Sequence, residues 1–195
     1  MKFSQILTAP NQLTLLRMIF VPFIVIHLVE GRYLWALVVF MIAGFSDGLD
    51  GLLARSLHQQ TLLGQYLDPI ADKLLLSTMF LVLSILKKIP WEFAVVVFSR
   101  DISILAASAV LFMIAGLRNF RPSIFGKANT FSQIAAVFFV MLMEVRPSAW
   151  IWGARTVFLW ATFFFTIASA LHYLILVQQR LKQPSHALPP SSPKP

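Results

Sequence analysis

The stretch DGLDGLLARSLHQQTLLGQYLDPIAD, residues 47–72, places aspartates inside one of the most apolar parts of the chain. Half of the eight acidic residues of the chain fall in these 26 positions, namely Asp47, Asp50, Asp68 and Asp72. A carboxylate at membrane depth costs about 2.5–3.5 kcal/mol on insertion scales, so a group of them needs compensation. This concentration of charge predicts a bound cation that takes part in the chemistry of the protein.

Both aspartate pairs have helical spacing. A first set, at positions i, i+3, i+4 and i+7, consists of Asp47, Asp50, Gly51 and Ala54. A second set, at positions i, i+4, i+7 and i+8, consists of Gly64, Asp68, Ala71 and Asp72. Each set lies on one face of a helix. Residues 55–63 are numerous enough to turn the chain back, so two neighbouring helices can present two carboxylates each to a shared cleft.

The chemistry of these ligands favours a hard divalent cation. Carboxylate oxygens select Mg²⁺, Mn²⁺ or Ca²⁺ over zinc, and the absence of cysteine excludes a thiolate site. Four carboxylates can hold one or two ions, and two ions about 4 Å apart are a known clamp for phosphoryl-type displacement. Small residues beside the ligands let a bulky group approach or let helices pack closely. The alternatives are protonated aspartates, or solvated carboxylates at helix ends.

The composition is that of an integral membrane protein. Of the 195 residues, 58% are hydrophobic and 12% are charged, whereas soluble domains are about a quarter charged. The length predicts one domain. The net charge of +8 favours cytoplasmic loops and anionic lipid headgroups as partners over nucleic acid.

The apolar segments predict an all-α membrane fold with six transmembrane helices. They are expected at 13–29, 33–53, 67–86, 91–116, 125–143 and 151–177. A short interfacial helix within residues 1–12 is expected before the first of them. The membrane domain then covers residues 1–182. The tail 183–195 holds five of the eleven prolines and is predicted to be disordered.

The distribution of basic residues predicts the orientation in the membrane. With six spans, both termini and the second and fourth loops share one side. That side carries the larger set, Lys2, Arg55, Arg118, Arg121, Lys127, Arg180, Lys182 and Lys194. The other side carries Arg32, Lys87, Lys88, Arg146 and Arg155. The aspartates are therefore expected at the cytoplasmic face, in a bacterial inner membrane.

Residues 47–72 resemble the signature D-x2-D-G-x2-A-R-x8-G-x3-D-x3-D of the CDP-alcohol phosphatidyltransferase family, with every fixed position matched. The resemblance extends over residues 10–178. It implies a six-helix membrane enzyme, usually a homodimer, that binds a CDP-linked lipid, usually CDP-diacylglycerol. An acceptor hydroxyl attacks the β-phosphorus, and CMP is released.

The same resemblance implies roles for single residues. Asp47, Asp50 and Asp68 are expected to ligate Mg²⁺ or Mn²⁺, in a site for two ions. Asp72 is expected to be associated with the metal and to act as the general base, since a carboxylate beside a metal can take the proton of the alcohol. The site of the CDP-linked lipid is expected to be lined by Gly51, Ala54, Arg55 and Gly64.

Near the N-terminus, Asn11, Thr14 and Arg17 resemble a family feature that frames the nucleotide. Their alternative roles are physical ones: Asn11 or Thr14 caps the first helix, and Arg17 reaches the lipid headgroups.

A second basic group is the candidate site for the acceptor. The run Gly126-Lys127-x2-Thr130-x2-Gln133 resembles a region of phosphatidylglycerol-phosphate synthases, and a related form occurs in CMP-forming cardiolipin synthases. An anion pocket is expected from Arg100, Arg118, Arg121 and Lys127. The alternatives are an internal ion pair between Arg100 and Asp101 and ordinary loop charge for the others. Lys73, directly after Asp72, is expected to balance local charge.

The resulting hypothesis is transfer of a phosphatidyl group to sn-glycerol 3-phosphate, giving phosphatidylglycerol phosphate. The nearest alternative acceptor is phosphatidylglycerol, which gives cardiolipin, and inositol-phosphate and serine acceptors are less favoured. A cation or proton transporter is the alternative from another class. The clustering of the acids toward one face argues against it, because a transport path needs a relay through the other helices.

Overall fold

The structure, a computed structural model, is built from helices alone in the part of the chain that it describes. It describes residues 9–57, 62–115 and 124–182, with side chains at 18–46, 73–103 and 126–171. The helices are α1 (Ala9–Val29), α2 (Tyr33–Leu57), α3 (Leu62–Ile85), α4 (Trp91–Ala115), α5 (Ile124–Val145) and α6 (Ala149–Lys182). The predicted all-α fold class is therefore confirmed, with six helices in the described residues.

Two predicted segments fall partly or wholly outside the described residues. The interfacial helix expected within residues 1–12 overlaps α1, which already includes residues 9–12, and residues 1–8 are not described. The C-terminal tail, 183–195, is likewise outside them.

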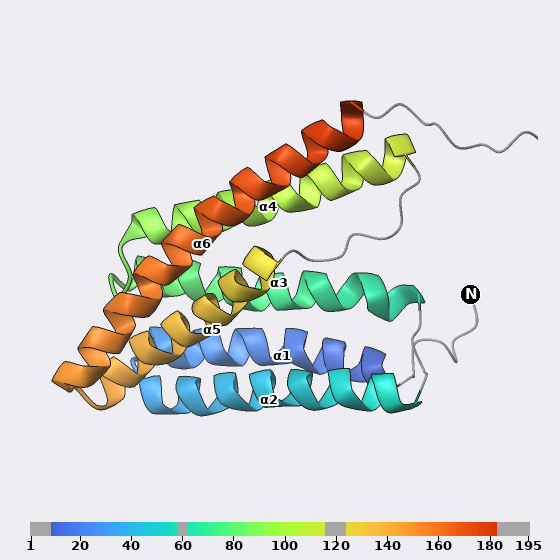
Figure 1. Ribbon diagram of the computed structural model, residues 1–195. Helices are drawn as coiled ribbons and strands as arrows, with labels where there is room; N and C mark the ends of the chain where they lie inside the picture. The colour runs from blue at the N-terminus through green and yellow to red at the C-terminus, as the bar shows by residue number, and fades with distance from the viewer. Residues whose placement is uncertain (1–8, 58–61, 116–123, 183–195) are drawn as a thin grey trace, which may run out of the picture.

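Helix α1 lies between α2 and α3 and packs against both (Figure 1). Helix α5 packs against α6 and reaches α2 and α3, while α4 packs between α3 and α6. The core is formed by apolar side chains from all six helices, for example Ile24, Phe40, Met79 and Val137, each 4% exposed or less. Because this core ties α3 to its neighbours on several sides, it determines where the aspartate-bearing half of α3 lies.

Helices α1 and α3 end in the same kind of turn. After α1, the N–H groups of Gly31 and Arg32 donate to the carbonyls of Leu28 and His27, and Gly31 has φ = 72°. After α3, Lys87 and Lys88 donate to Ser84 and Leu83 in the same pattern, and Lys87 has φ = 57°. This is the Schellman arrangement, in which the left-handed residue is usually glycine. Lys87, which occupies this left-handed position after α3, is therefore strained.

A group of polar residues closes the end of the bundle at which α3 meets α4 and α5 meets α6. We call it the loop cluster: Tyr33, Lys88, Glu144 and Arg155. Lys88 Nζ pairs with Glu144 Oε2 and lies 5.3 Å from the centre of the Tyr33 ring. Arg155 Nη2 donates to the backbone carbonyl of Lys88. The cluster thus connects the loop between α3 and α4 to the end of α5, more than fifty residues away in the chain, and to α6.

Two helical segments in the described residues are long and apolar enough to cross a bilayer. They are Gly126–Val145 and Ala149–Leu171, 20 and 23 residues long, each with mean hydropathy 1.5. A span needs about 20 predominantly apolar residues. Three shorter apolar stretches are Met18–Val29, Tyr33–Ser46 and Lys73–Ile85.

Candidate functional site

The aspartate-rich segment occupies two successive helices at one end of the bundle. Asp47 and Asp50 belong to the C-terminal half of α2, and Asp68 and Asp72 to the N-terminal half of α3. Those two halves lie at the same end, because only residues 58–61 separate the helices (Figure 1). The side chains at 47–72 are outside the described set. Their roles as metal ligands and general base therefore stay predictions.

The other residues expected to hold the CDP-linked lipid lie on three helices that meet at this end. The first group, Asn11, Thr14 and Arg17, lies near the start of α1. The second group consists of Gly51, Ala54 and Arg55 on α2 and Gly64 on α3. Because α1 packs against both α2 and α3, the backbone brings the two groups to one region. Contacts of these side chains are again outside the described set.

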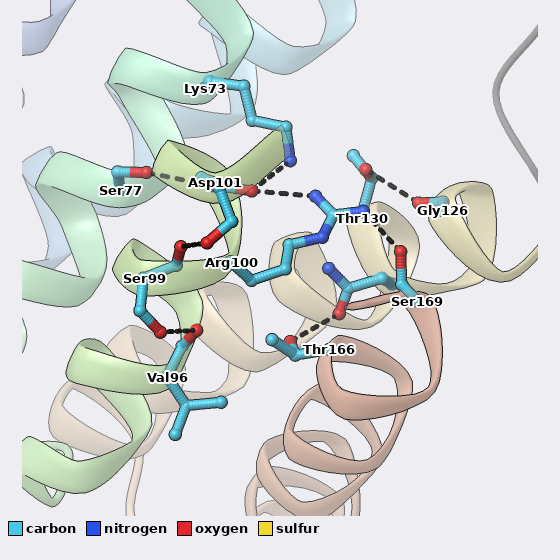
Figure 2. Close-up of polar contacts among 12 residues, drawn as sticks. Lys73, Ser77, Val96, Ser99, Arg100, Asp101, Gly126, Thr130, Thr166 and Ser169 are labelled. Carbon is cyan, nitrogen blue, oxygen red and sulfur yellow. Dashed lines mark hydrogen bonds and ion pairs between the residues drawn. The ribbon is translucent and has the colours of Figure 1, made fainter. Parts of the chain in front are cut away.

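A buried polar group lies next to this region, between α3, α4 and α6. We call it the Asp101 network: Lys73, Ser77, Arg100, Asp101 and Ser169. Asp101 Oδ1 accepts from Lys73 Nζ and from Arg100 Nη1, both at 2.8 Å (Figure 2). Ser77 Oγ donates to the other carboxylate oxygen at 3.2 Å, and Arg100 Nη2 donates to Ser169 Oγ at 2.8 Å. The Asp101 carboxylate therefore joins α3 to α4, and Arg100 extends the connection to α6.

The pairing of Arg100 with Asp101 is an internal ion pair, as one of the two sequence hypotheses held. Arg100 is 6% and Asp101 4% exposed. Burial of charge is tolerated only with pairing and hydrogen bonds, which both side chains have. Lys73 does pair with a carboxylate, and one partner is Asp101 on α4, 28 residues away in the chain. The participation of Arg100 in acceptor binding stays a prediction.

The remaining residues of the predicted acceptor pocket are only partly visible. Arg118 and Arg121 lie outside the described residues, and Lys127 is exposed in the first turn of α5. In the run that follows Lys127, Thr130 Oγ1 donates to the carbonyl of Gly126 in its own helix, at 3.1 Å. Lys127, at the start of α5, is thus exposed, whereas Arg100 is enclosed.

The contacts between α5 and α6 were not predicted from the sequence. Asn129 Oδ1 accepts from Thr166 Oγ1 at 2.9 Å, with both residues buried. One turn further into the bundle, Gln133 and Thr162 are fully buried. A signal existed in the sequence, because Thr162, Thr166 and Ser169 lie at i, i+4 and i+7 in an otherwise apolar helix. Such spacing predicts a polar seam on one helix face.

Comparison with known proteins identifies a family. The model of the family described as CDP-alcohol phosphatidyltransferase matches residues 7–168. A Bacillus subtilis protein named CDP-diacylglycerol--glycerol-3-phosphate 3-phosphatidyltransferase is 31% identical over 189 residues, covering 89% of this chain and 96% of its own length.

Two further relatives carry a different name. A Mycobacterium tuberculosis protein named "Putative cardiolipin synthase" is 29% identical over 195 residues, covering 94% of this chain and 91% of its own length. The human "Cardiolipin synthase (CMP-forming)" is 38% identical over 101 residues, which are 51% of this chain and 34% of the human protein. Since the family model spans most of the chain, including the whole aspartate segment, the chain belongs to the CDP-alcohol phosphatidyltransferase family.

Proposed function

We propose that the protein transfers a phosphatidyl group from CDP-diacylglycerol to sn-glycerol 3-phosphate, releasing CMP, as a step of phospholipid biosynthesis. The observation that carries the proposal is the complete aspartate signature over 47–72, within the matched family region. Its two halves fall on α2 and α3, at one end of the bundle. That placement is what a shared site between the two helices requires.

The donor set fits one or two divalent cations. Asp47, Asp50 and Asp68 would hold Mg²⁺ or Mn²⁺ together with Asp72, because these ions prefer carboxylate oxygens. When bound, the ions would neutralise charge on the pyrophosphate oxygens and on the departing CMP. Positions without bulky side chains, such as Gly51 and Gly64, leave room for the nucleotide.

The residues of the chain then perform the remaining chemistry. The acceptor oxygen forms a bond to the β-phosphorus, and the bond from that phosphorus to the oxygen of CMP breaks. The Asp72 carboxylate takes the proton of the acceptor hydroxyl. Arg55 pairs with a phosphate group of the CDP-linked lipid in a bidentate way. The atoms balance as a new phosphodiester, CMP and one proton.

The choice of acceptor rests on two observations. The B. subtilis relative bears glycerol 3-phosphate in its name and matches over nearly its whole length. Lys127 is exposed in the first turn of α5, where its ammonium is open to a small phosphorylated molecule. Phosphatidylglycerol is the second candidate acceptor, because the M. tuberculosis and human relatives are named as cardiolipin synthases.

We further propose that all six helices cross a bacterial cytoplasmic membrane and that the protein forms a homodimer. Large apolar side chains are exposed on every helix, as lipid contact requires. Exposed tryptophans gather at the starts of α2, α4 and α6, namely Trp35, Trp91, Trp150 and Trp152. Tryptophan marks membrane–water interfaces. These helix starts lie opposite the aspartate end, which we place at the cytoplasmic face.

An acceptor assay tests the proposed reaction. Purified protein would be incubated with CDP-diacylglycerol, Mn²⁺ or Mg²⁺ and one acceptor at a time, and CMP and the lipid product would be measured. We expect CMP release with glycerol 3-phosphate. A cardiolipin product with phosphatidylglycerol alone would select the second acceptor. Ion flux in liposomes without CMP from any acceptor would reject the enzyme in favour of a transporter.

Asp72→Asn tests the proposed base. Turnover should fall by about 10²- to 10⁴-fold, the usual contribution of a general base, while the thermal unfolding midpoint stays close to that of the wild type. Glu144→Gln, which makes the same chemical change at the opposite end of the bundle, is the matched control and should keep its turnover. Near-normal turnover of Asp72→Asn would remove Asp72 as the base.

A further inference from the structure

Two contacts on α3 converge on the single carboxylate of Asp101. Lys73 Nζ and Ser77 Oγ lie 2.8 Å and 3.2 Å from its two oxygens. Residues four apart share one helix face, so both contacts lie on the face of α3 that is turned toward Asp101 of α4. With two points of contact one turn apart, Asp101 restrains the rotation of α3 about its axis (Figure 2).

That rotation also determines where the aspartate face of α3 points. Asp72 directly precedes Lys73, and neighbouring residues lie about 100° apart around a helix. The helical position of Asp68 shares the face of Asp72. A rotation of α3 that releases Lys73 from α4 would therefore redirect both metal-ligand positions.

Lys73 also brings a positive charge next to the acidic segment in the chain. Opposite charges attract strongly where water is scarce. An ammonium released from Asp101 would be drawn to the neighbouring carboxylates and would compete there with a divalent cation. In the structure, Lys73 Nζ lies 2.8 Å from Asp101 Oδ1 on α4, and the Lys73 side chain is 24% exposed.

Asp101 is itself firmly anchored. Its side chain is 5% exposed, and Arg100 donates both to it and to Ser169 of α6. The anchor therefore belongs to the α4–α6 side of the bundle, and α3 is held against it.

We propose that Asp101 is a positioning residue for the aspartate site. Through Lys73 and Ser77 it restrains the rotation of α3 in addition to the core, and it binds the Lys73 ammonium on α4. The proposal rests on the proposed function, because it assumes that Asp68 and Asp72 bind a divalent cation.

Binding of Mn²⁺ alone to the purified full-length protein tests this without turnover. Free and bound Mn²⁺ are distinguished by electron paramagnetic resonance. We expect Asp101→Asn to weaken Mn²⁺ binding by about 10- to 100-fold, the usual effect of losing a residue that orients metal ligands. Glu144→Gln, the matched control at the far end, should bind Mn²⁺ like the wild type.

A double variant separates positioning from general damage. If Asp101 acts through Lys73, Asp101→Asn combined with Lys73→Met should bind Mn²⁺ more tightly than Asp101→Asn alone, because the released ammonium is gone. Wild-type affinity in a folded Asp101→Asn protein would overturn the proposal. So would a double variant that binds no more tightly than Asp101→Asn.

Ser77→Ala provides the test if Asp101→Asn does not fold. This variant removes only one hydrogen bond to Asp101 and should weaken Mn²⁺ binding by a few fold. An unchanged affinity for Mn²⁺ would overturn the proposal. Wild-type protein that binds no Mn²⁺ would also overturn it. Wild-type protein that binds Mn²⁺ but releases no CMP would refute the proposed function while leaving the positioning role intact.

Discussion

The Asp101 network and the loop cluster use the same charged groups in different surroundings. In the network, Arg100 and Asp101 are buried between α3, α4 and α6. In the loop cluster, Lys88 of the loop between α3 and α4 pairs with Glu144 at the end of α5, and their side chains are 30% and 27% exposed. Both clusters join segments distant in the chain, but only the network lies beside the aspartate-bearing half of α3.

The difference in burial changes what each carboxylate contributes. Water can solvate Lys88 or Glu144 when their pair is broken, so the pair contributes little to stability. The Arg100 guanidinium has little access to water, and loss of its partner leaves an uncompensated buried charge. The network therefore imposes one arrangement of the three helices, whereas the loop cluster adjusts the stability of an arrangement that the core already determines.

The largest expected effect comes from Asp101→Asn. It should lower the free energy of unfolding by about 3–5 kcal/mol, the cost of breaking a buried pair by removing one partner. Reversible unfolding in detergent mixtures measures this change. A loss no greater than that of Glu144→Gln would show that burial does not distinguish the two clusters.

Glu144→Gln makes the same chemical change in the loop cluster, with a smaller expected effect. Stability should fall by about 1 kcal/mol or less, and the loss should shrink as salt is added. The unfolding free energies of variant and wild type would be compared at low and high ionic strength. A loss that does not depend on salt would contradict the interpretation of this pair as solvent-exposed.

This pair also has a defined pH dependence. The hydrogen bond that Lys88 donates to Glu144 raises the pKa of Lys88 above its ordinary value of 10.5. A raised lysine pKa gives stability that is fully present below the ordinary value and is lost as the pH rises through the folded-state pKa. The wild type should therefore lose its advantage over Glu144→Gln in that alkaline range.

Lys87→Gly should have the smallest effect, and it should be stabilising. The left-handed conformation costs a residue with a Cβ about 1–2 kcal/mol, and part of this gain is offset by the flexibility of glycine in the unfolded chain. We expect a gain of about 0.5–1 kcal/mol. Gly31→Ala in the equivalent turn after α1 should be destabilising. If both variants changed the free energy of unfolding in the same direction, the shared turn geometry would be contradicted.

The sequence predicted the helices well because their ends carry local signals. The Glu30-Gly31-Arg32 break correctly predicted the boundary between α1 and α2. The predicted start of the fourth helix at Trp91 is also the observed start of α4. Differences arose where polar residues continue a helix. Helix α3 begins at Leu62, five residues before the predicted span, and α6 continues to Lys182. Hydropathy marks the apolar part of a helix, whereas backbone hydrogen bonding extends into polar sequence.

The candidate site likewise has a part that the sequence predicts and a part that it does not. The aspartate spacing and the family could be predicted from the sequence, because both depend on residue types at fixed intervals within 26 positions. The hydrogen-bond partners of Lys73 and Arg100 were harder to predict from the sequence. Ser169, which accepts a hydrogen bond from Arg100, lies 69 residues away. Such a partner depends on how α4 and α6 pack.

By itself, the sequence determined the helical fold, the grouping of carboxylates on two helix faces and membership of the family. Those properties depend on spacing along the chain, which helical periodicity converts directly into shared faces. Only the tertiary structure decided that Lys73 turns to Asp101 on α4 and that Arg100 is enclosed while Lys127 is exposed. The reason is physical: burial and long-range pairing follow from the packing of whole helices, which no local interval encodes.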